Sequence, residues 1–410
     1  MIQFLKNIGH FFEARLWRLA YGIPDKGMRI FGVTGTNGKT TTCYLLARVL
    51  EEAHGKQHVG ILTTVAFRIG GQEEINETKM TTLPSRKIFS YLARMKKAGV
   101  EYVVLETTSH ALDQHRISGI QFDGAIILNV TREHLDYHGT MKQYARAKEK
   151  IVRYLRIGAP LVGKESDAHV RKMMDRAEKR GLNVIRMTNE SIANTMTILS
   201  GSINKENACA VALLGHALDI PAKVIQSGIN AVSSVPGRME KFQTPQGVTV
   251  IIDYAVTPDA LERLYADIKK DLARRSFSEG GKILATLSAA GLRDRGKRAD
   301  MARAVAKYAD YIVVTREDPW TESEEQIFSD LENGLPSPYQ GEGGGEVGRK
   351  VVWQHIVDRR EALKTLLQQA KPGDVVVATG KGAERGMGIG KEVVPWNERE
   401  VINELLADSF

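Results

Sequence analysis

Three glycines, one lysine and one threonine near the start of the chain have types and a spacing suited to holding phosphate groups. Gly32, Gly35 and Gly38 lead into Lys39 and Thr40 in the stretch GVTGTNGKT. Glycines let backbone N–H groups converge on phosphate oxygens, a lysine can reach the terminal phosphates, and a threonine hydroxyl suits Mg²⁺. The stretch therefore predicts a phosphate cradle.

The elements on either side of this stretch are those that a phosphate cradle needs. Ile30 and Phe31 are typical of a strand that runs into the glycines, and a helical pattern follows until Gly55. A helix that begins at the loop directs its N-terminal N–H groups at the anion. The strict P-loop spacing is missed because Val33 stands five positions before Gly38, so an ordinary glycine-rich surface turn is the alternative.

Further residues that could hold a metal follow later apolar runs. Glu106 ends the run Tyr102–Glu106, and His134 follows the run Ala125–Val130. In a parallel sheet the carboxyl ends of the strands meet at one edge, so we expect both side chains near the glycine loop. Taken singly, a strand-end glutamate is more often a cap, a loop histidine more often only hydrogen-bonds, and Tyr144–Lys150 is typical of a solvated basic helix.

The length and the alternation of elements predict an α/β protein with more than one domain. A chain of 410 residues is too long for a single core. Strand and helix patterns alternate to about residue 230, break at Ser233–Gly237, and then resume. We expect an N-terminal amphipathic helix (1–27), a central P-loop domain with a mostly parallel sheet (28–233) and a smaller, doubly wound Rossmann-like domain (234–410).

Composition restricts the partners and the compartment. The net charge of +8 favours anionic ligands, but no basic–aromatic array or nucleic-acid module is present, so no nucleic-acid partner is expected. Cys43 and Cys209 form no disulfide framework, which fits the cytoplasm. Residues 1–21 form a basic amphipathic pattern, with apolar residues from Phe4 to Leu19, that either packs on the protein or contacts a membrane surface.

Seven motifs that follow one another in a fixed order give the chain a resemblance to a known family. They are GVTGTNGKTTT, LETTSHALDQHR, NVTREHLDYHG with YARAK, PGRME, DYAVTPDAL, GLRDRGKR and TGKGAE. Over residues 28–410 the chain resembles the Mur ligase family, most closely the UDP-N-acetylmuramyl-tripeptide synthetases. The resemblance implies an ATP-dependent amide ligase of peptidoglycan precursor synthesis. ATP would phosphorylate a peptide carboxylate, and an amino acid's amine would attack the acyl phosphate.

The resemblance also implies site residues. ATP would contact Thr34, Gly35, Thr36, Asn37, Gly38, Lys39, Thr40, Thr41, Asn204, Asn207 and Arg238. Mg²⁺ ions would be held by Thr40, Glu106, His134 and a carbamylated Lys148, because an ammonium only donates whereas carbamate oxygens suit a hard cation. The acceptor would contact Thr81, Thr82, Ser109, Gln114 and Arg116. The catalytic group would comprise Lys39, Glu106, His134, Lys148, Arg238 and Asp253, with Lys297 also facing the reaction centre.

The chain departs from the family pattern in several places. Only 27 residues precede the loop strand, where tripeptide synthetases carry a domain that binds the uridine nucleotide. The acceptor is therefore expected to lack its UDP end or to be lipid-linked. DNPR is replaced by EDPW, which leaves Asp318 and Glu384 but puts Trp320 at the arginine, so lysine or a smaller amino acid is as plausible as diaminopimelate. Val256, Leu292 and Ala383 replace polar family residues.

Three alternatives follow from these departures. The chain could be a related ligase acting on a lipid-linked or other non-UDP acceptor, or a folylpolyglutamate-synthase-like ligase, which DYHG and QHR disfavour. It could also be a nucleotide-binding protein that has lost ligation. The sequence leaves open the amino acid, the acceptor's carrier and the oligomeric state.

Overall fold

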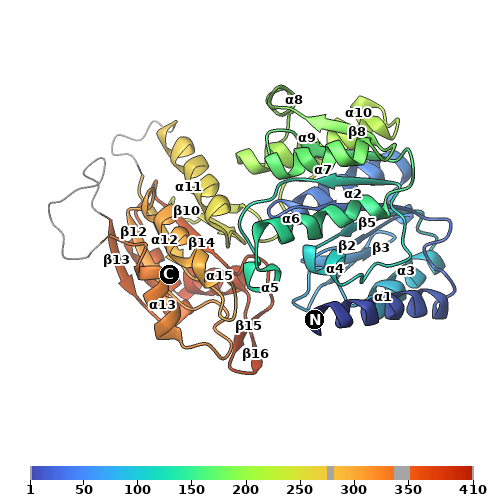
Figure 1. Ribbon diagram of the computed structural model, residues 1–410. Coiled ribbons are helices and arrows are strands. Elements are labelled where there is room, and N and C mark those ends of the chain that lie inside the picture. The colour runs from blue at the N-terminus through green and yellow to red at the C-terminus, as the bar shows by residue number, and fades with distance from the viewer. Residues whose placement is uncertain (1, 275–280, 337–350, 409–410) are drawn as a thin grey trace. The chain divides into compact units, whose positions relative to one another are not determined.

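The computed structural model describes residues 2–274, 281–336 and 351–408, with side chains described from residue 6. The chain divides into two compact units (Figure 1). The first unit comprises Met1–Thr131 and His138–Ser233, and the second comprises Arg132–Tyr137 and Ser234–Phe410. The segment 132–137 thus groups with the second unit although it lies within the sequence of the first.

The first unit is built on an eight-stranded sheet in the order β4-β3-β2-β5-β1-β6-β7-β8. Its strands are β1 (Arg29–Thr34), β2 (Val59–Leu62), β3 (Ala66–Ile69), β4 (Gln72–Ile75), β5 (Tyr102–Glu106), β6 (Gly124–Ile127), β7 (Pro160–Lys164) and β8 (Asn183–Met187). The six strands from β2 to β8 are parallel, and β3 and β4 add an antiparallel edge. The expectation of a mostly parallel sheet is confirmed.

The hairpin β3–β4 was not predicted from the sequence. All four residues of β4 are exposed, so the strand buries no apolar face that alternation could reveal. Gly70 and Gly71, at φ 56° and 87°, make the turn between the two strands.

Helices cover both faces of this sheet (Figure 1). They are α1 (Ile2–Ala20), α2 (Lys39–His54), α3 (Ser85–Lys97), α4 (Ser109–Asp113), α5 (Leu135–His138, which crosses the boundary between the units), α6 (Met141–Glu149), α7 (Ala168–Glu178), α8 (Asn189–Ala193), α9 (Ser202–Ala217) and α10 (Ala222–Asn230). Short 3₁₀ turns occupy Lys56–His58 and Lys150–Tyr154. Helix α2 ends at Gly55, as predicted, where φ is 94°.

Helix α1 has one face on the protein and one face exposed. Ala14 is fully buried in the core, and Trp17 packs against that core from the same side of the helix, as does Tyr21 just beyond the helix end. On the opposite side Phe12 and Leu16 are 64% and 62% exposed. The side chains of Phe4 and Leu5 lie outside the described residues. Among the described residues, no helix combines the length and apolarity that crossing a bilayer requires.

The second unit carries a six-stranded sheet in the order β13-β12-β11-β14-β10-β9. Its strands are β9 (Glu240–Gln243), β10 (Thr249–Asp253), β11 (Ile283–Leu287), β12 (Tyr311–Val314), β13 (Val352–His355) and β14 (Val375–Thr379). All are parallel except the edge strand β9. Most of the low-complexity stretch Glu332–Gly348 lies outside the described residues.

Two hydrophobic clusters lie on opposite faces of this second sheet, which is the doubly wound arrangement expected. One cluster includes α11 (Pro258–Ala273), α12 (Arg298–Ala306) and α13 (Glu324–Glu332). The other includes α14 (Arg359–Gln369) and α15 (Glu398–Asp408). A separate hairpin joins β15 (Gly386–Ile389) and β16 (Glu392–Pro395), and Arg295–Lys297 forms a 3₁₀ turn.

Candidate active site

The glycine loop lies at the topological switch point of the first sheet. Strand β1 sits between β5 and β6, and the chain passes from β1 to β2 on one side and from β5 to β6 on the other. In open α/β sheets such a point opens a crevice at the carboxyl ends of the strands. The segments that follow β1, β5 and β6 therefore meet at one edge.

The loop conformation requires glycine at its last position. Gly38 has φ 87°, and a Cβ there would lie 2.3 Å from Oδ1 of Asn207 on α9. Asn129, which follows β6, accepts hydrogen bonds through Oδ1 from the backbone N–H of Thr36 (3.0 Å) and of Asn37 (2.8 Å). Two asparagines from distant segments thus hold the loop against the head of α2.

Glu106, at the end of β5, is buried against this loop. The hydroxyl Oγ1 of Thr40 lies 3.1 Å from both carboxylate oxygens. The backbone N–H of Thr64 donates to Glu106 Oε2 at 2.9 Å, and Thr64 Oγ1 lies 3.0 Å from Glu106 Oε1 and from Thr81 Oγ1. Thr64 was missed from the sequence, although it is a hydroxyl residue just beyond a strand that neighbours β5.

Two lysines approach the backbone of the loop. Lys148, which is buried on α6, donates from Nζ to the Gly35 carbonyl at 2.7 Å and lies 4.6 Å from the centre of the Tyr144 ring. Lys39 Nζ donates to the carbonyls of Gly35 (3.1 Å) and Thr36 (3.0 Å). Tyr144 in turn lies 3.1 Å from Thr36 Oγ1 through its hydroxyl. The structure therefore brings Lys39, Lys148 and Glu106 to one loop.

The donor set beside the loop fits Mg²⁺. One carboxylate and one hydroxyl, from Glu106 and Thr40, offer hard oxygen ligands. Across the described part of the chain, no group of three or more histidine, cysteine, aspartate or glutamate side chains could hold a metal on its own. Such a sparse set suits a cation that takes its remaining ligands from substrate phosphates and water.

The thiol of Cys43, close behind the loop, is not reactive in this setting. Burial, followed by the negative charge of Glu106, raises the pKa of Cys43 well above its usual value, whereas Lys39 opposes the shift. A buried protonated thiol is a poor nucleophile, so the loop offers no cysteine chemistry.

The residues predicted to contact the acceptor form a connected group beyond β5. Thr82 Oγ1 donates to the Glu106 carbonyl at 2.9 Å, and Arg116 donates to the Thr82 carbonyl at 2.7 Å. Arg116 also holds the Gln114 side chain through bonds of 2.9 and 2.6 Å. Ser109 Oγ lies 3.0 Å from Nε2 of His138.

His138 was not among the predicted site residues. Burial lowers its pKa to about 4, so the ring is neutral near pH 7 beside Ser109. The signal for it was its place in DYHG, four residues after His134.

The asparagines predicted for the adenine end lie together on α9. Asn207 Nδ2 lies 3.4 Å from Asn204 Oδ1, and Asn204 donates to the Ser200 carbonyl at 2.7 Å. Because Asn207 also touches the glycine loop, α9 couples the two parts of the predicted nucleotide site.

In the second unit, a buried lysine connects the predicted amino-acid residues. Lys381 Nζ donates to Asp318 at 2.9 Å and to Glu384 at 2.5 Å. Burial opposes its charge, but Glu384 and then Asp318 raise the pKa of Lys381, so the ammonium persists. The Tyr254 hydroxyl donates to Glu384 at 3.2 Å.

Trp320 takes a structural position in the same region. The Trp320 backbone has φ 51°. The Trp320 ring packs directly on Gly388, because a Cβ at Gly388 would lie 2.5 Å from the ring atom Cε2. No cation stands at this position of the chain to pair with a carboxylate.

Arg238 and Asp253 lie at the start of the second unit. The Arg238 guanidinium lies 4.5 Å from the centre of the Tyr254 ring, and Asp253 accepts a bond of 2.5 Å from the Met239 N–H. Burial raises the pKa of Asp253, and Arg238 opposes the shift.

His134 also groups with the second unit, within the segment 132–137. Its neighbour Glu133 accepts a bond of 2.5 Å from Lys297 Nζ. That His134 binds a metal together with Glu106 and Lys148 therefore stays a prediction.

An α/β unit with a glycine loop at a strand–helix junction, backed by a strand-end glutamate and two lysines, defines a phosphate-binding protein of the P-loop class. The Mur ligase middle domain matches residues 33–227, and the Mur ligase glutamate ligase domain matches residues 237–382. The chain is 33% identical to the UDP-N-acetylmuramyl-tripeptide synthetase of Roseiflexus sp. (strain RS-1), over 95% of this chain and 80% of that protein. The chain belongs to the Mur ligase family.

Solved structures agree with this assignment. A UDP-N-acetylmuramoyl-L-alanyl-D-glutamate–2,6-diaminopimelate ligase matches 99% of this chain and 83% of its own, at 27% identity and a TM-score of 0.58. A bifunctional folylpolyglutamate synthase/dihydrofolate synthase from Yersinia pestis CO92 matches 91% of this chain and 90% of its own, at a TM-score of 0.66. At 22% identity, the second likeness concerns the fold alone.

Proposed function

We propose that the protein is an ATP-dependent, Mg²⁺-requiring ligase that adds an amino acid to a muramyl-peptide-type acceptor in peptidoglycan precursor synthesis. The observation that carries this proposal is the convergence of Glu106, Thr40, Lys39 and Lys148 on one glycine loop. Family membership supports the same reaction.

The reaction is a condensation in two steps. An oxygen of the acceptor's carboxylate attacks the γ-phosphorus of ATP, and ADP leaves, which produces an acyl phosphate. The amino acid's nitrogen then attacks the acyl carbon, and phosphate leaves with the oxygen that formed the bridge. The ammonium gives up two protons as it becomes the amide nitrogen. Both steps bring anions together, so the site must supply positive charge.

The residues at the loop have distinct parts in this reaction. Lys39, at the head of α2, holds the terminal phosphates by charge and hydrogen bonds. Thr40 and Glu106 would hold Mg²⁺, which neutralises phosphate charge when it is bound. Asn204 and Asn207 position the nucleoside end of ATP. The guanidinium of Arg238 binds the phosphates.

Lys148 is proposed to act as its carbamate. Addition of CO₂ replaces a donor-only ammonium by an anionic group with two acceptor oxygens. The residue is buried beside the loop, and with His134 it would provide ligands for a second Mg²⁺. Burial favours the neutral amine, which is the form that attacks CO₂, and a bound Mg²⁺ would compensate the charge of the carbamate.

The amino acid is proposed to bind in the second unit near Asp318, Glu384 and Trp320. The two carboxylates can receive an amine, whereas Trp320 cannot pair with a carboxylate as an arginine would. Lysine and small amino acids are therefore candidates alongside diaminopimelate.

A peripheral contact with an anionic membrane surface through residues 1–21 is part of the proposal. Helix α1 exposes Phe12, Leu16 and Leu19, and it also carries the exposed cations Lys6 and Arg15. Exposed apolar side chains beside cations suit the boundary of an anionic bilayer. Flotation with anionic vesicles tests this contact, which Phe12→Glu should abolish. The remainder of the chain is proposed to work in the cytoplasm, where ATP is available and where Cys43 and Cys209 stay as free thiols.

Phosphate release tests the ligase. ATP, Mg²⁺ and a muramyl dipeptide are offered with a panel of amino acids, and release should depend on one of them. Glu106→Gln keeps the side chain's size but removes its charge, so we expect the rate to fall at least about 100-fold. Glu52→Gln, on the exposed side of α2, is the matched control and should keep the wild-type rate. Hydrolysis that no amino acid stimulates would instead support a nucleotide-binding protein without ligation.

A further inference from the structure

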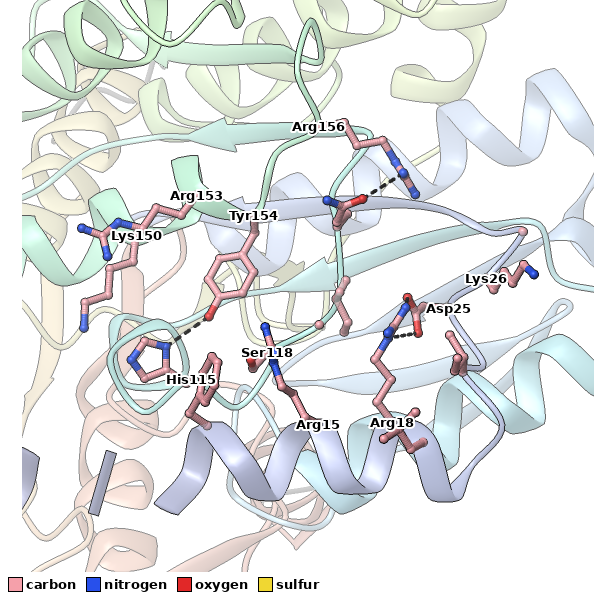
Figure 2. A pocket seen from close by; sticks show the side chains of 17 residues that line it. Arg15, Arg18, Asp25, Lys26, His115, Ser118, Lys150, Arg153, Tyr154 and Arg156 are labelled. Carbon is pink, nitrogen blue, oxygen red and sulfur yellow. Dashed lines mark hydrogen bonds and ion pairs between the residues drawn. The ribbon is translucent and has the colours of Figure 1, made fainter. Parts of the chain in front are cut away.

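A cavity of about 930 Å³ lies in the first unit between α1 and two segments, residues 115–121 and 150–156 (Figure 2). We call it the α1 cavity. Figure 2 shows Arg15 and Arg18 rising from α1 into the space below the segment that carries Arg153 and Tyr154. None of the residues predicted for ATP or for the amino acid lines it.

The lining of the α1 cavity is strongly cationic. Asp25 is the one carboxylate among the described lining residues. The cationic side chains are Arg15, Arg18, Lys26, Lys150, Arg153 and Arg156. Such an excess favours an anionic ligand of more than one charge.

Three of these cations already have carboxylate partners. Arg18 forms two bonds of 2.8 Å with Asp25, so it neutralises the only carboxylate of the lining. Lys150 pairs with Asp113 at 2.7 Å. Arg156 pairs with Asp123 at 2.9 Å.

Among the four arginines of the lining, Arg15 and Arg153 are the two that a ligand could use. Neither forms an ion pair with any acidic side chain in the described ranges of the chain. Arg15 is held by the Phe11 ring, with 4.4 Å from its guanidinium carbon to the ring centre. The two arginines come from different walls of the cavity: Arg15 rises from α1, and Arg153 belongs to the 150–156 segment above it (Figure 2).

The walls of the cavity are formed by defined contacts. Gly119 has φ 99°, and a Cβ at this position would lie only 2.6 Å from Cδ of Arg18. The absence of a side chain at Gly119 therefore leaves room for the aliphatic part of the Arg18 side chain. The Phe11 ring meets the His115 ring edge-on at 5.7 Å, and the Tyr154 hydroxyl lies 3.4 Å from His115 Nδ1. Burial raises the pKa of Tyr154 to about 12, so the phenol stays a neutral donor.

The α1 cavity adjoins the predicted acceptor residues. His115, which lines it, stands between Gln114 and Arg116 in the chain. Asn7 of α1 donates to Asp113, at the end of α4, at 3.0 Å. An acceptor held at Gln114 and Arg116 would therefore extend its carrier end toward α1.

We propose that the α1 cavity binds the diphosphate that links the acceptor to its carrier, with Arg15 and Arg153 as the phosphate-binding residues. This inference rests on the proposed function for the identity of the acceptor. A diphosphate is a compact anion whose oxygens suit guanidinium donors from two walls. The carrier beyond it is either a nucleoside or a polyisoprenyl lipid, and both present the same diphosphate.

Binding of inorganic pyrophosphate to the full chain tests the cavity without ligation. The nucleotide site is first filled with Mg²⁺ and a non-hydrolysable ATP analogue, so that pyrophosphate cannot bind there. We expect calorimetry to detect binding that weakens at least tenfold in the double variant Arg15→Glu, Arg153→Glu. Arg171→Glu, on the exposed side of α7, is the matched control and should bind as the wild type. Equal weakening by the control, or unchanged binding in the double variant, would overturn the proposal.

Ligation kinetics then identify the carrier. The double variant should raise KM about tenfold for an acceptor that carries the diphosphate, with kcat unchanged, and leave a phosphate-free muramyl dipeptide unaffected. Whichever diphosphate acceptor shows the KM change, nucleoside-linked in solution or polyisoprenyl-linked in vesicles, is the source. If neither changes, the proposal is wrong even where the ligase works. If no acceptor is ligated, the proposed function fails while the pyrophosphate titration still decides on the cavity.

Discussion

At the scale of single residues, Lys148 carries the most specific chemistry. A lysine with 2% of its surface exposed, bonded to a loop carbonyl, is unusual because burial penalises the ammonium. The carbamylation proposed for Lys148 would replace the buried ammonium with oxygen ligands.

Labelled bicarbonate tests the modification directly. With ¹³C-bicarbonate, we expect one carbamate carbon signal in the wild type and none in Lys148→Arg, because the guanidinium does not form a stable carbamate. Ligation should fall at least about 1000-fold in the variant, the scale of losing a main electrostatic stabiliser. Lys142→Arg, on the exposed side of α6, is the control and should keep both signal and rate. A signal that survives Lys148→Arg would assign the carbamate elsewhere.

Gly38 shows how one residue controls the loop. Gly38→Ala meets both a positive φ and a contact of 2.3 Å with Asn207, whereas Gly99→Ala, at φ 77°, meets open space. We expect the Gly99 variant to lose about 1 kcal/mol of unfolding free energy and to keep ATP affinity. The Gly38 variant should lose more stability and at least tenfold in ATP affinity.

Adding Asn207→Ala to Gly38→Ala separates the two causes. The double variant should recover only part of the stability, because the clash is gone while the positive φ remains. It should not recover ATP affinity, because Asn207 is itself a predicted nucleotide contact. Thermal denaturation and titration with an ATP analogue measure both. Equal behaviour of the Gly38 and Gly99 variants would contradict this account of the loop.

At the scale of elements, a buried ion pair ties the second unit together. Arg359, at the start of α14, donates to Glu398 at the start of α15 through bonds of 3.0 and 2.6 Å, and both side chains are fully buried. The same guanidinium donates to the Thr379 carbonyl at the end of β14, at 2.7 Å. It therefore positions the turn that continues to Lys381.

Breaking this pair should destabilise the second unit. Arg359→Met leaves Glu398 buried without its partner, which costs about 3–5 kcal/mol of unfolding free energy. The adjacent Arg360 forms an exposed pair with Glu404 at 2.6 Å, so Arg360→Met should change stability little. Urea denaturation compares the two, and equal losses would show that the buried pair has no special role.

Sequence reasoning was successful for elements whose signals are local. The run Tyr102–Glu106 became β5 with the same bounds, because a buried parallel strand is a continuous apolar run. The hairpin β3–β4 and the edge strand β9 were not predicted, because these strands are short and partly exposed and so form no continuous apolar run.

In the candidate site, too, the residues with a local sequence signal were predicted and the contacts that depend on tertiary structure were not. The loop, Glu106 and Lys148 were found from motifs, but their contacts depend on strand order. Thr64 joins Glu106 only because β2 lies beside β5, and Asn129 reaches the loop only because β6 lies beside β1. The α1 cavity also arises from tertiary packing, which no spacing in the sequence reveals.

At the scale of the whole molecule, the chain has the two domains of a Mur ligase together with local departures from the family motifs. The chain spans 80% of the Roseiflexus relative and matches the Mur middle and glutamate ligase domains. The glycine loop follows the family motif closely, whereas Trp320 and the helix α1 lie at the ends of the chain's site that are proposed to bind the amino acid and the acceptor.

The central claim, acyl-phosphate ligation, is tested most directly by following oxygen. The muramyl acceptor is labelled with ¹⁸O in its carboxylates and supplied with ATP, Mg²⁺ and the amino acid that stimulates phosphate release. Mass spectrometry should find one ¹⁸O in each phosphate released and an acceptor extended by one amino acid. Unlabelled phosphate, or phosphate formed without the extended product, would contradict the account.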